Sequence, residues 1–298
     1  MNQIALSFLA VIPALLLCWY VYEKDRIEKE PLGLLILLFL AGAAAFLPSI
    51  ALEKTLVGAF DEAFRSQTEV SLTGVRTFLT TGAKLGHSLS CALLGVALVE
   101  EGLKFAVLVL ITYKNKNFGH LFDGVVYALF VSLGFAAAEN LRFALMDGWD
   151  TLLLRFVSSL PAHMIFGVIS GICYTLWHGY RLARLKEKIL ESEGVLTVEK
   201  PLVTYPRLIL TFLLPFAVHG FYAFGEFFGG ALLRYLFYAL LLIPFVLSFV
   251  VLHRLSKADS VDDEIAFRFL IKRYPHLKGK EDTTLDDLEA MEKEEENA

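Results

Sequence analysis

The segment ALVEEGLKFAVLVL, residues 97–110, places Glu100, Glu101 and Lys104 inside a stretch that is otherwise apolar. The apolar run around it extends over residues 87–112. A helix that crosses a lipid bilayer needs about 20 mostly apolar residues, so this run is long enough. The segment therefore predicts a membrane-spanning helix that carries two acids and one base.

The composition of the whole chain points the same way. Of 298 residues, 56% are hydrophobic and only 20% are charged, 25 are phenylalanine, and the mean hydropathy is +0.58. Soluble domains are nearer half apolar and a quarter charged. These values exclude a disordered chain, a coiled coil and a basic nucleic-acid-binding protein. They predict an all-α, polytopic helix bundle in a lipid bilayer, a multi-pass protein of the cell membrane with no nucleic-acid partner.

About seven transmembrane helices are expected from apolar stretches of sufficient length. They are residues 3–22, 32–52, 87–112, 122–146, 157–179, 207–226 and 231–252. Lysine and arginine concentrate in alternate connections, at 23–31, 113–121 and 180–206, and the long connection 53–86, whose bases are spread out and partly balanced by acids, is the exception. Because basic connections remain in the cytoplasm, we expect the N-terminus outside and the C-terminus in the cytoplasm.

The expected organisation is a transmembrane bundle over residues 1–256, followed by a cytoplasmic tail over 257–298. Residues 53–86 form an amphipathic connection expected at the outer face. Residues 281–298 hold nine acidic side chains and one lysine, so they carry a net charge of −8 and leave +3 on the rest of the chain. Cys18, Cys91 and Cys173 all lie in apolar segments, and their spacing is not that of a metal clip, so they are expected to be packing residues.

Ionisable side chains in four of the expected spans need an explanation, since each costs about 2.5–3.5 kcal/mol at the membrane centre on insertion scales. Considered separately, each of these side chains has an ordinary structural explanation. Glu100 can pair with Lys104 within one helix, Glu139 can pair with Arg142 at the interface, and a histidine can simply be packed. Taken together, they lie at similar depths and predict one cavity in the outer half of the membrane. The residues are Glu100, Glu101, Glu139, His163 and His219.

Acids and histidines without a recognisable serine or cysteine nucleophile suit the activation of water. A carboxylate accepts the proton of water, and a histidine donates to the developing oxyanion. The same side chains suit a divalent metal such as zinc, with Glu101, Glu139, His163 and His219 as candidate ligands. HExxH and GxSxG are absent. The residues leave open a glutamate-dependent or a metal-dependent hydrolysis of an amide.

Five motifs, in this order and spacing, resemble the PrsW family of intramembrane proteases, which is distantly similar to the CAAX prenyl protease and bacteriocin-processing superfamily. They are YEKDRIEKEP at 22–31, EEGLK at 100–104, FDGVVYALFVSLGFAAAEN at 122–140, PAHMIFGVISG at 161–171 and HGFYAF at 219–224. The resemblance implies a multi-pass membrane protease whose substrate is a single-pass membrane protein, such as an anti-sigma factor, cut near the outer face.

The same resemblance assigns site residues. Glu100 and Glu101 match the paired catalytic glutamates, Glu139 matches the FxxxE carboxylate, and His163 and His219 match the later histidines. The family is described as metal-dependent and its distant relatives as glutamate-dependent, so the resemblance implies either mechanism. Ala223 stands where the family often has asparagine or aspartate, which leaves that role to Tyr222.

Two other classes of function remain open from the sequence. Buried acids also serve proton- or cation-coupled transporters, although such proteins often contain inverted repeats and this chain has none that we detect. A catalytically inactive scaffold that binds a transmembrane partner is the third hypothesis, supported by Ala223 alone. The sequence predicts no oligomeric state.

Overall fold

The structure is a computed structural model that describes residues 3–65, 68–70, 77–79, 81–260 and 262–278. The acidic run at 281–298 lies outside these residues. The first half of the chain forms α1 (Gln3–Lys24), α2 (Leu32–Phe64), β1 (Thr68–Val70), β2 (Thr77–Leu79), α3 (Thr81–Leu89), the π-helix η2 (Ser90–Ala97) and α4 (Leu98–Thr112). The second half forms α5 (Asp123–Asp147), α6 (Trp149–Val157), α7 (Ser159–Ser192), α8 (Tyr205–Phe228), α9 (Ala231–Lys257), α10 (Asp262–Arg273) and the 3₁₀ turn Pro275–Leu277.

Six helical segments of the described chain are long and apolar enough to cross a membrane, which confirms a polytopic, largely α-helical protein. They are α1, α2, α5, the run of α6 and α7, α8 and α9. The expected third span, 87–112, is instead divided among α3, η2 and α4, which follow one another directly. Their junction residues Leu89 and Leu98 keep right-handed helical dihedrals, so the rod continues through the π-helix. α2 and α7 extend well beyond the ends expected for their spans.

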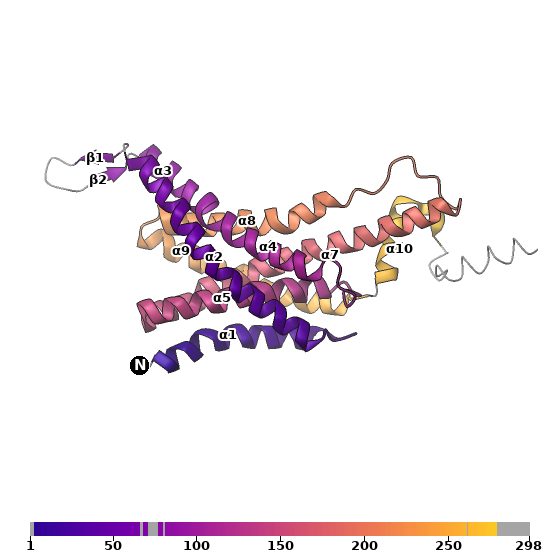
Figure 1. Ribbon diagram of the computed structural model, residues 1–298, viewed down its shortest axis with the longest axis horizontal. Coiled ribbons are helices and arrows are strands. Elements are labelled where there is room, and N and C mark those ends of the chain that lie inside the picture. The colour runs from indigo at the N-terminus through magenta and orange to yellow at the C-terminus, as the bar shows by residue number, and fades with distance from the viewer. Residues whose placement is uncertain (1–2, 66–67, 71–76, 80, 261, 279–298) are drawn as a thin grey trace, which may run out of the picture.

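Helix α5 lies at the centre of the bundle (Figure 1), where it packs against α1, α2 and α7. Its most apolar window is 83% buried, whereas that of α9 is 17% buried. The antiparallel β1–β2 hairpin and the N-terminal end of α1 lie at one end of the molecule, and α10 lies at the opposite end (Figure 1). The two ends of the molecule therefore carry different elements.

The outer faces of the bundle are apolar. Leu47, Leu110 and Phe221 are 69%, 84% and 64% exposed. In water such surfaces would drive aggregation, but in a bilayer they contact acyl chains at no cost. The sides of the described bundle therefore suit contact with lipid, and its centre is packed with protein side chains.

Two glycines let α2 and α5 cross in backbone contact. A Cβ atom on Gly42 would lie 2.1 Å from the carbonyl oxygen of Val131, and one on Gly134 would lie 2.1 Å from that of Phe39. Membrane helices associate through small residues that allow such close approach. This crossing holds Glu139, one helical turn beyond Gly134 and Phe135, close to α2 and inside the bundle.

Buried carboxylates gather at the α10 end of the bundle, where backbone amides bind them. The Glu30 amide donates to Asp25 at 3.1 Å, and the Gly119 and His120 amides donate to Asp123 at 2.9 and 2.8 Å. Burial raises the pKa of Glu30 to about 7, and the negative charge of Asp25 adds to this effect. Glu30 therefore binds a proton more tightly in the folded protein than in the unfolded chain.

A pH dependence of stability follows from this shift. Since the folded-state pKa of Glu30 is raised above the unfolded value, its contribution to stability is greatest below about pH 4.5 and is lost as the pH rises through about 7. Replacing Glu30 with glutamine is expected to flatten this decline in thermal unfolding measured across pH 4.5–8. The exposed Glu191 on α7, changed to glutamine, serves as the control and should leave the slope unchanged. Parallel curves for wild type and Glu30→Gln would contradict the assignment.

Candidate active site

Two glutamates begin α4, directly after the π-helix, and both are buried together with the lysine one turn on. Glu100 and Glu101 are each 4% exposed, and Lys104 is 5% exposed. Their spacing places the three side chains on one face, where the Lys104 ammonium donates to Glu100 Oε2 at 3.2 Å and to Glu101 Oε1 at 2.7 Å. One ammonium thus faces two carboxylates, and the α4 side of the site carries excess negative charge when both acids are ionised.

Helix α8 brings His219 to the same carboxylate. His219 Nδ1 lies 2.8 Å from Glu101 Oε1, and its ring stacks on Phe166 with centroids 4.6 Å apart. An ionised carboxylate only accepts hydrogen bonds, so the proton of the histidine lies on Nδ1. In the neutral ring, Nε2 then carries a lone pair.

Helices α7 and α5 supply the other half of the site. Lys104 Nζ lies 3.0 Å from His163 Nδ1, and His163 Nε2 lies 3.0 Å from Glu139 Oε2. Because an ammonium only donates, Nδ1 of His163 accepts and Nε2 donates its proton to Glu139. The ring centroids of His163 and His219 are 6.0 Å apart. The structure therefore gathers all five expected residues, from four helices, around Lys104.

Sequence reasoning missed Arg155, which binds Glu139. A guanidinium nitrogen of Arg155 lies 2.5 Å from Glu139 Oε2, and the same side chain donates to Asn140 Oδ1 and Ser159 Oγ at 2.7 Å each. The sequence suggested Arg142 as the partner of Glu139, since it lies one turn away on α5. Arg155 lies on the short helix α6, and its only signal was a single base among the apolar residues of WDTLLLRFV.

A cavity of about 430 Å³ opens beside these side chains. This volume is within the usual range of ligand pockets. Its wall includes Glu100, Glu139, Arg155, His163, His219 and Tyr222, and also Ala223. Glu101 is not part of this wall and turns toward Lys104 and His219.

The residues present fit a divalent metal. Among the described residues, Glu100, Glu101 and His219 each offer a ligand atom, and these atoms all lie within 4.8 Å of one another. Carboxylate oxygens and imidazole nitrogens are both zinc ligands, and three such donors leave a fourth position for water. Of the other expected ligands, Glu139 is bound by Arg155, and His163 contacts Lys104 and Glu139 through its two ring nitrogens.

Buried acids and imidazoles on converging membrane helices, beside a cavity and with donors for a metal, fit an intramembrane hydrolase. Comparison with known proteins identifies the family. The model of the PrsW family of intramembrane metalloproteases matches residues 30–249, and the chain belongs to this family.

Relatives named protease PrsW extend over most of the chain. The protein from Oceanobacillus iheyensis is 30% identical over 253 residues, which are 84% of this chain and 94% of the relative. That from Clostridioides difficile is 32% identical over 173 residues, 57% of this chain and 64% of the relative. That from Bacillus subtilis is 26% identical over 256 residues, 85% and 94% of the two chains. No solved structure matches the chain.

Family membership confirms the resemblance found in the motifs. The chain is a multi-pass intramembrane protease, and it acts on protein substrates. This result favours the protease over the transporter and the inactive scaffold, the two other hypotheses that the sequence left open.

Proposed function

We propose that this protease hydrolyses a peptide bond of a single-pass membrane protein, such as an anti-sigma factor, with water activated by Glu100. The observation that carries the proposal is the meeting of Glu100, Glu139, His163 and His219 on one wall of a cavity of about 430 Å³. Glu100 is the better placed of the paired glutamates for the general base, because it borders the cavity and its bond to Lys104 is the longer one.

Glu101 and His219 act as a pair in this proposal. Glu101 holds the proton of His219 on Nδ1 at 2.8 Å, which orients the ring toward the cavity. Should the ring take up a second proton, the negative charge of Glu101 stabilises the imidazolium, as a buried acid does in serine proteases. His219 Nε2 then donates to the carbonyl oxygen as it gains negative charge.

Glu139 and His163 position groups at the opposite wall. Lys104 and Arg155 fix the two ends of the His163–Glu139 hydrogen bond, so neither side chain is free to turn toward lipid. In the metal-dependent alternative, Glu100, Glu101 and His219 would hold a divalent ion, with Glu100 a ligand instead of the base, and the ion would polarise the carbonyl group and lower the pKa of bound water. Either way, Glu139 and His163 orient the attacking water or the substrate carbonyl.

We further propose that the end with the β1–β2 hairpin faces outside and the end with α10 faces the cytoplasm. The three basic connections, at 23–31, 113–121 and 180–206, lie at the α10 end. Ser256, at the end of α9, donates to the Lys24 carbonyl, and Arg181 donates to the Tyr113 carbonyl at 2.8 Å. Basic connections stay in the cytoplasm, so this end is the inner one.

The test is cleavage by the purified full chain in proteoliposomes that also contain a single-pass anti-sigma factor. We expect a new cleavage product, detected by mass spectrometry, and no flux of protons or cations. Ion flux without any cleavage would favour the transporter and contradict the proposal.

Arg155 should be required for efficient cleavage. Replacing it with glutamine releases Glu139 and His163 from their positions, and misplaced catalytic groups cost about 10²-fold in rate. We therefore expect kcat of Arg155→Gln to fall by about 10–10²-fold while KM changes little. Arg142→Gln, a matched change on α5 next to Glu139, should retain wild-type kcat. Equal losses in both variants would remove the specific role of Arg155.

A further inference from the structure

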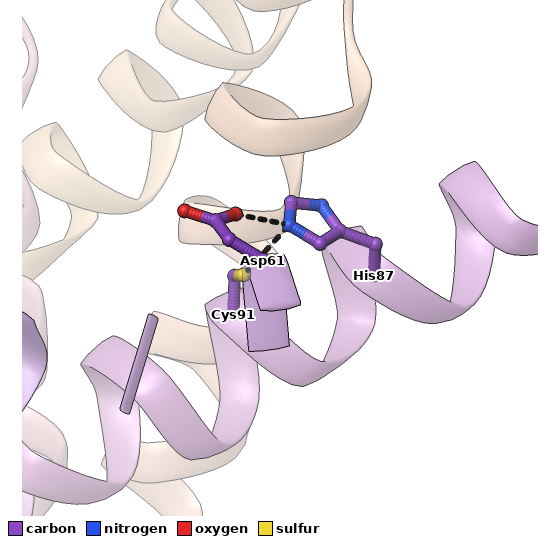
Figure 2. Close-up of side chains that lie close together, drawn as sticks. All are labelled: Asp61, His87 and Cys91. Carbon is purple, nitrogen blue, oxygen red and sulfur yellow. Dashed lines mark hydrogen bonds and ion pairs between the residues drawn. The ribbon is translucent and has the colours of Figure 1, made fainter. Parts of the chain in front are cut away.

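A second group of potential metal ligands lies outside the active site, where the end of α2 meets α3 and the π-helix. Figure 2 shows the Asp61 carboxylate and the Cys91 sulfur both directed at one ring nitrogen of His87. His87 Nε2 lies 2.7 Å from Asp61 Oδ1 and 3.5 Å from Cys91 Sγ, and one ligand atom from each residue lies within 4.8 Å of the other two. None of the three borders the catalytic cavity.

The geometry differs from that of a catalytic Cys-His-Asp relay. In such a relay, the nucleophile and the acid contact opposite nitrogens of the imidazole. Here both contact Nε2: a proton on this atom is donated to Asp61, whereas a lone pair accepts from the Cys91 thiol but not from the carboxylate, so neither tautomer suits both contacts. A cation bound by all three side chains removes this conflict, because each contributes a lone pair.

The distances suit a tetrahedral ion. With zinc–sulfur and zinc–nitrogen bonds of about 2.3 and 2.0–2.1 Å, the sulfur and nitrogen of a tetrahedral site lie about 3.5–3.6 Å apart. The observed separation of Cys91 Sγ and His87 Nε2 is 3.5 Å. The Asp61 oxygen must move outward by about half an ångström to reach the same geometry. Its side chain is 59% exposed and has room to do so.

The surroundings hold two ligands firmly and leave one side open. His87 and Cys91 are four residues apart, which places them on one face of the continuous helical rod. Cys91 is fully buried, and the Phe64 ring packs edge-on against His87 with centroids 5.6 Å apart. Exposure of Asp61 leaves a side from which an ion and a water ligand can enter.

We propose that Asp61, His87 and Cys91 form a second metal site, which binds a thiolate-preferring divalent ion such as Zn²⁺. Binding releases the thiol proton of Cys91, and the ion is held by sulfur, nitrogen and oxygen, with water in the fourth position. The ion joins the end of α2 to the π-helix that leads directly into α4. It therefore braces the helix that carries Glu100 and Glu101 without taking part in the reaction.

Cobalt substitution tests the proposal, because Co²⁺ bound by a thiolate gives an intense charge-transfer band in the near ultraviolet. The active-site donors Glu100, Glu101 and His219 contain no sulfur, so this band reports on the second site alone. We expect the purified full chain in detergent to bind one Co²⁺ with this band. The band should persist in Glu101→Gln, which alters only the active-site donors, and in Cys173→Ser, a matched change at another buried cysteine.

The band should disappear in Cys91→Ser. Asp61→Asn changes an exposed side chain, so this variant is expected to fold. It should raise the Kd for Co²⁺ at least tenfold. It keeps the test valid if Cys91→Ser fails to fold. Absence of the band in the wild-type chain, its persistence in folded Cys91→Ser, or an unchanged Kd in Asp61→Asn would each overturn the proposal.

Discussion

Replacing Glu100 with glutamine is expected to reduce peptide hydrolysis on the order of 10³-fold, the usual effect of losing a general base. Glutamine keeps the size of the side chain and its position on the cavity wall, but it cannot accept the proton of water. The Lys104 ammonium retains Glu101 as a partner at 2.7 Å, so the variant should still fold. The measurement is the initial rate of cleavage per folded molecule in proteoliposomes.

The matched control is Glu187→Gln. Glu187 is also fully buried, but it lies toward the far end of α7, where it accepts from the Leu202 amide at 2.9 Å and pairs with Arg184. If loss of any buried carboxylate lowered activity through the fold, both variants would lose it together. We expect Glu187→Gln to keep its activity per folded molecule. Near-normal turnover by Glu100→Gln would exclude Glu100 as the base.

Gly42→Ala is expected to give the largest loss of stability from a single added methyl group. The new Cβ would lie 2.1 Å from the Val131 carbonyl oxygen, a backbone atom that cannot move without shifting all of α5. Overpacking usually costs 1–3 kcal/mol, and a clash with backbone belongs at the upper end, about 3 kcal/mol or more. The free energy of unfolding in mixed micelles measures the effect, and Gly134→Ala should behave alike at the reciprocal contact.

Gly58→Ala provides the comparison on the same helix. A Cβ at Gly58 meets no atom within 4 Å, so the substitution adds a methyl group to open space. Alanine is the better helix former by roughly 0.5–1 kcal/mol, and we expect this variant to be unchanged or slightly more stable. Equal stability of Gly42→Ala and Gly58→Ala would show that α2 and α5 do not cross in backbone contact.

Much of the fold was predictable because a membrane span can be recognised from the amino-acid composition of its segment. Six expected spans correspond to helices of the described chain, since about 20 apolar residues leave few alternatives. The division of 87–112 at the π-helix was not predictable, because SCALLGVA has the same apolar pattern as an α-helix. The extension of α2 to Phe64 was also missed, since residues 53–64 are amphipathic and their helical state depends on packing beyond the membrane.

The five expected site residues could be found because an ionisable group inside a membrane is costly and therefore rare, so each one is visible in the sequence even when its partner is unknown. Their partners were harder to find. Arg155 reaches Glu139 from a separate helix, and only the turn at Gly148 between α5 and α6 brings it there. The cluster of Asp61, His87 and Cys91 was hard to find for the same reason. The spacing of His87 and Cys91 places them on one helical face, but only the fold brings Asp61 next to them.

The most direct test of the account is a search for new peptide termini made with water. Wild-type protease and Glu100→Gln would each be reconstituted with the single-pass membrane proteins of the source cell, in ¹⁸O-labelled water, and analysed by mass spectrometry. The account predicts new carboxyl termini that carry one ¹⁸O atom, that come from a single-pass protein and that are absent with the variant. Identical peptide termini from both folded proteins would contradict it.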